Sequence, residues 1–139
     1  MPRVTGIHHV AITVAIIERS VAWYRKVRSF SSVLSAEHAD GTERNATMTN
    51  PESSVVFSPR VLPDSKVESL TETHAGRDNV GLAVEVQSSL EEWERHLTEL
   101  NVEHSPFTYH LLDGQSGYAV VAIREPDNVQ LELEFFCKA

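Results

Sequence analysis

The fold is decided by a stretch of sequence that occurs twice, first as IHHVAITV at residues 7–14 and then, 70 residues later, as RDNVGLAV at residues 77–84. The alignment that pairs His9 with Asn79 also pairs Trp23 with Trp93 without a gap. A repeated alternation that is followed at fixed spacing by a helical pattern indicates two copies of one supersecondary unit.

The first copy alternates between bulky residues and small or polar ones, as expected of a strand that is buried on one side. Val10, Ile12 and Val14 share the face suited to packing under a helix. The opposite face carries His9 and Thr13 with an alanine between them. Small residues beside polar groups leave room for a ligand, so we expect a pocket on this face, with Thr13 in contact with the ligand.

Each half of the chain reads β-α-β-β-β. The first half is predicted to have a helix at 18–27 and strands at 7–14, 33–37, 43–49 and 53–58, followed by a connector from Pro59 to Arg77. The second half is predicted to have an amphipathic helix at 90–100 and strands at 79–86, 107–111, 118–124 and 129–136. Ser88 and Glu91 predict a capping box at the start of that helix.

Composition restricts the possible partners. The chain has 139 residues and a formal net charge of -8, so it fits one domain and lacks the basic surface that nucleic acids and anionic membranes require. Its longest apolar run, at 10–17, is too short to span a membrane. The single cysteine, Cys137, cannot form an internal disulfide, which favours a cytoplasmic location.

Three motifs resemble signatures of a known superfamily. HVAITV at 9–14, SVAWYRK at 20–26 and REPDNVQLEL at 124–133 are similar to those of the vicinal oxygen chelate superfamily. That superfamily includes glyoxalase I, bleomycin-resistance proteins, fosfomycin-resistance enzymes and extradiol dioxygenases. The resemblance implies an α+β fold in which two tandem βαβββ modules form an incomplete barrel around a cleft. Residues 1–139 would be one such domain, with half-modules at about 5–60 and 77–137, and the protein would be a homodimer.

Metal-dependent members hold a divalent ion with four residues. The resemblance places three of these at His9, Asn79 and Glu132 and the fourth near Val56. Imidazole and carboxylate are good ligands, a neutral amide is a poor one for zinc, and valine donates nothing. Two alternatives follow: an incomplete site that holds Mn, Fe, Ni, Zn or Mg, completed by a loop histidine such as His110, or no metal at all. In the second case His9 and Glu132 could act as an acid–base pair.

Other residues are expected to contact the ligand. Glu134 has the parity of Glu132 and so shares its face, and Tyr118 lies on the strand that the resemblance places against the pocket. His110 falls where loops of the family overhang the cleft. Together with Thr13 and Asn79, these residues are the predicted ligand-binding set. Trp23 and Trp93 are expected to pack between helix and sheet.

Three functions remain open. The first is binding of a small apolar or aromatic molecule, for resistance by sequestration or in natural-product metabolism. The second is a divalent-metal-dependent lyase, isomerase or dioxygenase of the glyoxalase type, and the third is a metal-free biosynthetic enzyme. The sequence has no glycine-rich phosphate loop, no Gly-x-Ser-x-Gly elbow and no Cys-x-x-Cys motif, which argues against the common nucleotide-binding and serine-hydrolase classes.

Overall fold

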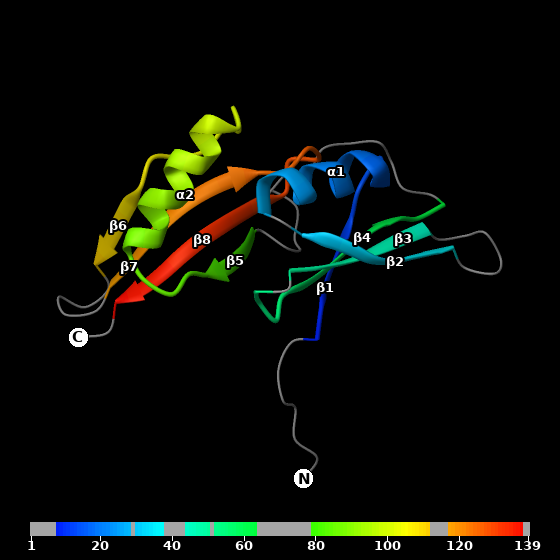
Figure 1. The fold of residues 1–139 in the computed structure, drawn as a ribbon, viewed down its shortest axis with the longest axis horizontal. Helices are drawn as coiled ribbons and strands as arrows, with labels where there is room; N and C mark the ends of the chain where they lie inside the picture. The colour runs from blue at the N-terminus through cyan, green and yellow to red at the C-terminus, as the bar shows by residue number, and fades with distance from the viewer. Residues whose placement is uncertain are drawn as a thin grey trace, which may run out of the picture. The chain divides into compact units, whose positions relative to one another are not determined.

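The computed structural model describes residues 8–28, 30–37, 44–50, 52–63, 79–111 and 117–137. The chain divides into two compact units, Met1–Glu68 and Ser69–Ala139. Each unit contains one helix and one four-stranded sheet in the order β-α-β-β-β (Figure 1). The predicted α+β class with two tandem βαβββ modules is therefore confirmed.

The first unit is built from a parallel strand pair and an antiparallel hairpin. The strands lie in the order β1-β4-β3-β2, with β1 parallel to β4 and the other pairs antiparallel. Its elements are β1 (Val10–Thr13), α1 (Ile17–Arg28), β2 (Ser31–Glu37), β3 (Arg44–Thr49) and β4 (Val56–Val61).

Aromatic stacking under α1 forms the core of this unit. The ring of Tyr24 stacks on that of Phe57 with centroids 5.2 Å apart, and Phe30 meets both rings edge-on. Ile12 and Met48 are also fully buried. The bulky face of the first repeat therefore packs under the helix, as its alternation predicts.

The second unit repeats this topology with longer strands. The order is β5-β8-β7-β6, with β5 parallel to β8 and the other pairs antiparallel. Its elements are β5 (Asn79–Ala83), α2 (Ser88–Glu99), β6 (Thr108–Leu111), β7 (Gly117–Arg124) and β8 (Gln130–Cys137).

Leucines on α2 and on β8 form the core of the second unit. Leu90 and Leu97 of the helix are fully buried, as are Leu131 and Leu133 of β8. Trp93 is only half-buried and its ring meets His96 edge-on at 5.5 Å, so it lies beside this core and does not fill it. In the described part of the chain, neither helix is long and apolar enough to cross a membrane.

Strand β4 lies three residues later than the sequence suggested. The sequence predicts that the connector starts at Pro59, but this residue is buried inside β4, opposite Ile12 of β1. The register with β3 runs through Phe57 and Arg60 and skips the two residues between them. Proline has no N–H to donate, so the ladder is interrupted there without ending the strand.

The capping box predicted at Ser88 does not form. The N-cap of α2 is Gln87, and it makes no side-chain capping bond. Backbone bonds occupy the first turn instead, from Ser89 N–H to the Val86 carbonyl at 3.0 Å and from Leu90 N–H to the Gln87 carbonyl at 2.9 Å. These bonds satisfy donors that a serine hydroxyl would otherwise accept from.

The turn between β7 and β8 contains a left-handed residue, Asn128, at φ 67°. Asparagine tolerates this conformation, whereas a β-branched residue is strained there by about 1–2 kcal/mol. We expect Asn128→Val to lower the free energy of unfolding by about that amount and Asn128→Gly to leave it nearly unchanged. Urea unfolding of the two variants measures the difference, and equal stabilities would contradict the proposed strain.

Candidate functional site

One face of the second sheet carries most of the chemistry. Alternate residues of its four strands point away from α2, and the strand register brings them side by side. We call this surface the polar face. Its described members are Asn79, Gly81, Ala83, Thr108, His110, Tyr118, Val120, Ala122, Arg124, Gln130, Glu132, Glu134 and Phe136.

Two neighbouring carboxyl groups, Glu132 and Glu134, lie at the centre of the polar face. Both are half-buried, and they are two residues apart on β8. The pKa of Glu134 is raised above its usual value, mainly because burial disfavours its charged form. A hydrogen bond to Glu132 and the negative charge of Glu132 raise it further. Glu134 therefore keeps its proton to higher pH than an exposed glutamate and can donate it to Glu132.

Gly81 makes room for this acidic pair. It lies opposite Glu132 in the register, and a Cβ atom on it would be 3.1 Å from Glu134 Oε2. The Glu134 side chain therefore lies across the backbone of β5, in space that any other residue at position 81 would reduce. Ala83 and Ala122 extend this floor of small side chains.

A chain of hydrogen bonds reaches the acidic pair from the β7–β8 turn. Arg124 donates from Nη1 to the Asn128 carbonyl at 3.0 Å and from Nη2 to Gln130 Oε1 at 2.8 Å. Gln130 Nε2 in turn donates to Glu132 Oε1 at 2.7 Å. The amide of Gln130 thus fixes the orientation of the Glu132 carboxylate.

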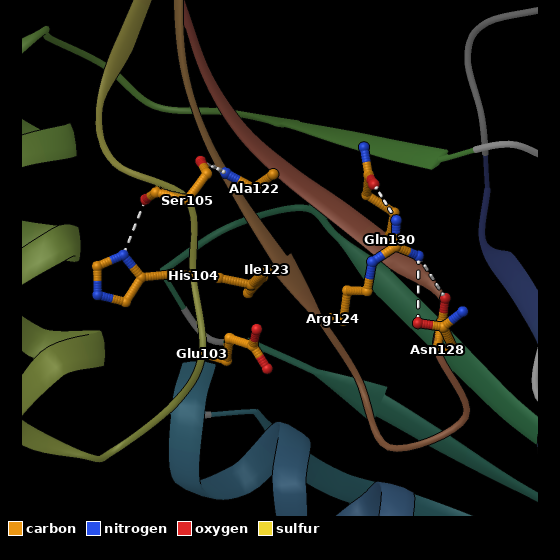
Figure 2. A pocket seen from close by; sticks show the side chains of 8 residues that line it. All are labelled: Glu103, His104, Ser105, Ala122, Ile123, Arg124, Asn128 and Gln130. Carbon is orange, nitrogen blue, oxygen red and sulfur yellow. Dashed lines mark hydrogen bonds between the residues drawn. The ribbon is translucent and has the colours of Figure 1, made fainter.

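A hollow adjoins this chain of hydrogen bonds (Figure 2). It has a volume of about 470 Å³ and lies between segment 103–105 and the β7–β8 turn. Ser105 closes one side, because its N–H donates to the Ala122 carbonyl at 2.8 Å and its Oγ accepts from the Ala122 N–H at 2.9 Å. The imidazole of His104 points away from Arg124, and its Nε2 lies 3.0 Å from Thr98 Oγ1. A volume of this size accommodates a small organic molecule.

Five of the seven predicted site residues lie on the polar face. Glu132, Glu134 and Asn79 come from β8 and β5. Tyr118 and His110 are cross-strand partners on β7 and β6, and their rings stack with centroids 4.8 Å apart. His110 therefore belongs to a strand and not to an overhanging loop.

His9 and Thr13 belong to the first unit. His9 precedes β1 and is exposed, and its Nδ1 lies 3.0 Å from Nδ1 of His8. Thr13 is also exposed and lies opposite Arg60 of β4 in the register. Their roles in ligand binding or catalysis remain predictions.

Gln130, Arg124 and Phe136 are members of the polar face that the sequence interpretation missed. The signal was available, since Gln130 and Phe136 have the same parity on β8 as Glu132. The link from Arg124 to Gln130 depends on side-chain reach across the strands, which no sequence pattern reveals.

The metal ligands that the family implies do not form a complete set in this chain. In the register, Glu132 lies opposite Gly81, and the equivalent pair in the first unit is Ser58 and Ala11. Ser58 is thus the first-unit equivalent of Glu132, two residues after Val56, and it carries a buried neutral hydroxyl. Within the described residues of either unit, no three His, Cys, Asp or Glu side chains gather around one point. Hydroxyl and amide groups are weak donors for transition metals, so this set does not fit a closed site.

Comparison with known proteins identifies the family. The profile of the Glyoxalase/Bleomycin resistance protein/Dioxygenase superfamily matches residues 6–133, and the chain belongs to this superfamily. No curated protein matches the sequence.

Solved structures share the fold at low sequence identity. A glyoxylase/bleomycin resistance protein/dioxygenase domain from Frankia sp. EAN1pec has a TM-score of 0.79 and 22% identity over 96% of this chain and 98% of its own. A lactoylglutathione lyase from Agrobacterium tumefaciens has a TM-score of 0.67 and 16% identity, with 96% of each chain covered. The fosfomycin resistance protein FosX from Listeria monocytogenes, solved with Mn(II) and a dihydroxypropylphosphonic acid, has a TM-score of 0.65 and 14% identity over 94% of this chain and 90% of its own. Fold similarity at these identities does not transfer an activity.

The raised pKa of Glu134 predicts a pH dependence of stability. The folded protein holds this proton more tightly than the unfolded chain, so stability falls as pH rises from about 4.5 through the raised pKa. Glu134→Gln removes the negative charge and keeps a hydrogen-bond donor. We expect this variant to be more stable than the parent at about pH 8, with the difference shrinking towards about pH 4.

Thermal unfolding across that pH range measures the effect. Glu99→Gln, at an exposed position at the end of α2, serves as the control and should give a flat difference. A difference for Glu134→Gln that does not change with pH would contradict the raised pKa of Glu134.

Proposed function

We propose that the protein binds a small organic molecule on the polar face of the second sheet and holds it through the acidic pair. The observation that carries the proposal is the neighbouring position of the half-buried Glu132 and Glu134 carboxyl groups on one face, beside a floor of small side chains. Two neighbouring carboxyl groups suit a ligand that carries a hydrogen-bond donor or a positive charge.

The net charge of the protein also favours a positively charged ligand. The formal net charge is -8, which attracts cations to the molecule and repels anions. From the bleomycin-resistance members of the superfamily we infer sequestration of a small molecule, for resistance or in natural-product metabolism, as the role of the protein. The cytoplasmic location suggested by the single cysteine and the homodimer suggested by the family are parts of the same proposal.

Equilibrium dialysis against a panel of antibiotics and metabolites tests the proposal. We expect at least one binder whose affinity falls about tenfold or more in Glu132→Gln or Glu134→Gln, because each substitution removes a charge or proton that the ligand pairs with. Glu99→Gln on α2 should bind as the parent does. The proposal fails if no compound in a broad panel binds, or if the binders are insensitive to both substitutions.

The alternative is a divalent-metal enzyme of the glyoxalase type. It is motivated by His9 and Glu132, which keep good ligand types, and by the Mn(II) in FosX, a structure of the same fold. The neutral groups at Asn79 and Ser58 argue against it. No catalytic step through a metal is derived for this chain.

Metal content decides between the two functions. We expect protein purified without chelator to carry much less than one metal per chain and to take up little at about 10 µM Mn²⁺, Ni²⁺ or Zn²⁺. Metal at one equivalent in the parent, lost in His9→Ala and in Glu132→Gln, would establish the metal enzyme instead.

A further inference from the structure

Three aromatic side chains form a row across one end of the polar face. His110 on β6 lies opposite Tyr118 on β7, and Tyr118 lies opposite Phe136 on β8. Direct cross-strand partners place their side chains about 5 Å apart on one face of a sheet. We call these three residues the aromatic row.

Two rings of the aromatic row stack on each other, and the third makes no ring contact within the described part of the chain. His110 and Tyr118 stack with an interplanar angle of 19°, so each ring supports the other. Phe136 is 55% exposed and makes no ring contact with another described residue. An aromatic ring that is exposed beside a stacked pair can close over a ligand and bury apolar area as it does so.

The acidic pair lies next to this row. Glu134 precedes Phe136 by two residues on the same strand and face, which corresponds to about 7 Å. Glu132 precedes Glu134 by two more residues and so lies the same distance again from the aromatic row. The aromatic row and the carboxyl groups are therefore separated by roughly the length of one substituted aromatic ring.

The charges near the aromatic row disfavour an anionic ligand there. Arg124 is the one lysine or arginine among the described members of this face. It lies at the end away from the aromatic row, and its guanidinium donates to Asn128 and Gln130. An anion placed near Tyr118 would meet two carboxyl groups and no opposing charge.

We propose that the polar face takes a planar aromatic cation, with the aromatic row holding its ring and the acidic pair holding its positive charge. This inference rests on the proposed function and names the ligand class of the same site. Aromatic faces attract cationic rings through their quadrupole, and the carboxyl groups reinforce that preference.

Four probes separate the contributions of ring and charge. We would titrate the full chain with four probes: 1-methylquinolinium as the aromatic cation, 2-naphthol as a neutral aromatic of similar size, 1-naphthoate as the aromatic anion, and cyclohexyltrimethylammonium as a non-aromatic cation. The readout is the Kd from chemical-shift changes of the backbone amides of β7 and β8. We expect 1-methylquinolinium to bind at least about tenfold more tightly than each of the other three, since it alone uses both halves of the site.

Matched variants test the residues themselves. Tyr118→Leu and Phe136→Leu should each weaken 1-methylquinolinium binding by about three- to tenfold, the range expected for one lost aromatic contact. Tyr109→Leu is the control, because Tyr109 is 44% exposed on the same strand as His110 but points to the opposite face. It should bind the probe as the parent does.

The outcomes distinguish this inference from the proposed function. Equal binding of 1-naphthoate and 1-methylquinolinium overturns the cationic class, and unchanged affinity in both leucine variants overturns the role of the aromatic row. Absence of any shift at about 1 mM probe overturns the inference as a whole. In each case the proposed function still stands if a panel compound of another class binds through Glu132 or Glu134, and it falls if none does.

Discussion

The second unit depends on a buried carboxylate in the turn between its two longest strands. Glu125 is 2% exposed, and its Oε1 accepts from the N–H of Asp127 at 2.8 Å and of Val129 at 3.2 Å. These bonds tie the turn together and so fix the register of β7 against β8. Because side chains alternate along a strand, a slip of one residue would turn Glu132 towards the helix and expose Leu133. In the slipped register the Glu132 carboxylate would be buried among leucines, which is costly. The hydrogen bonds of the turn and the packing of the leucines therefore favour the same register.

The two-residue period explains what could be predicted from the sequence. It placed Glu132 and Glu134 on one face and the bulky residues of both repeats under the helices, since parity alone decides these matters. It could not place β4, because a proline usually marks the end of a strand. Pro59 is tolerated inside β4 because the hydrogen-bond ladder between β3 and β4 is interrupted there. It gives Gln130 the same parity as Glu132, but it cannot show the hydrogen bonds that join Gln130 to Glu132 and to Arg124 on another strand.

The two units share one topology but differ in the chemistry of their faces. Where the second unit pairs Gly81 with Glu132, the first pairs Ala11 with Ser58. Where the second pairs Ala83 with Glu134, the first pairs Thr13 with Arg60. The frame of each module is set by the residues that pack under its helix, so the outward positions can differ without altering that frame. The duplication has thus produced one neutral-to-basic face and one acidic face on the same scaffold.

Strand β8 carries two interleaved sets of residues with separate consequences for evolution. Leu131 and Leu133 are fully buried, and substitutions there act on stability. Glu132, Glu134 and Phe136 retain solvent exposure, and substitutions there act mainly on what the surface recognises. A lineage can therefore explore new ligands one alternate position at a time while the folded state persists. A laboratory library restricted to the outward positions of this strand would sample specificity in the same way.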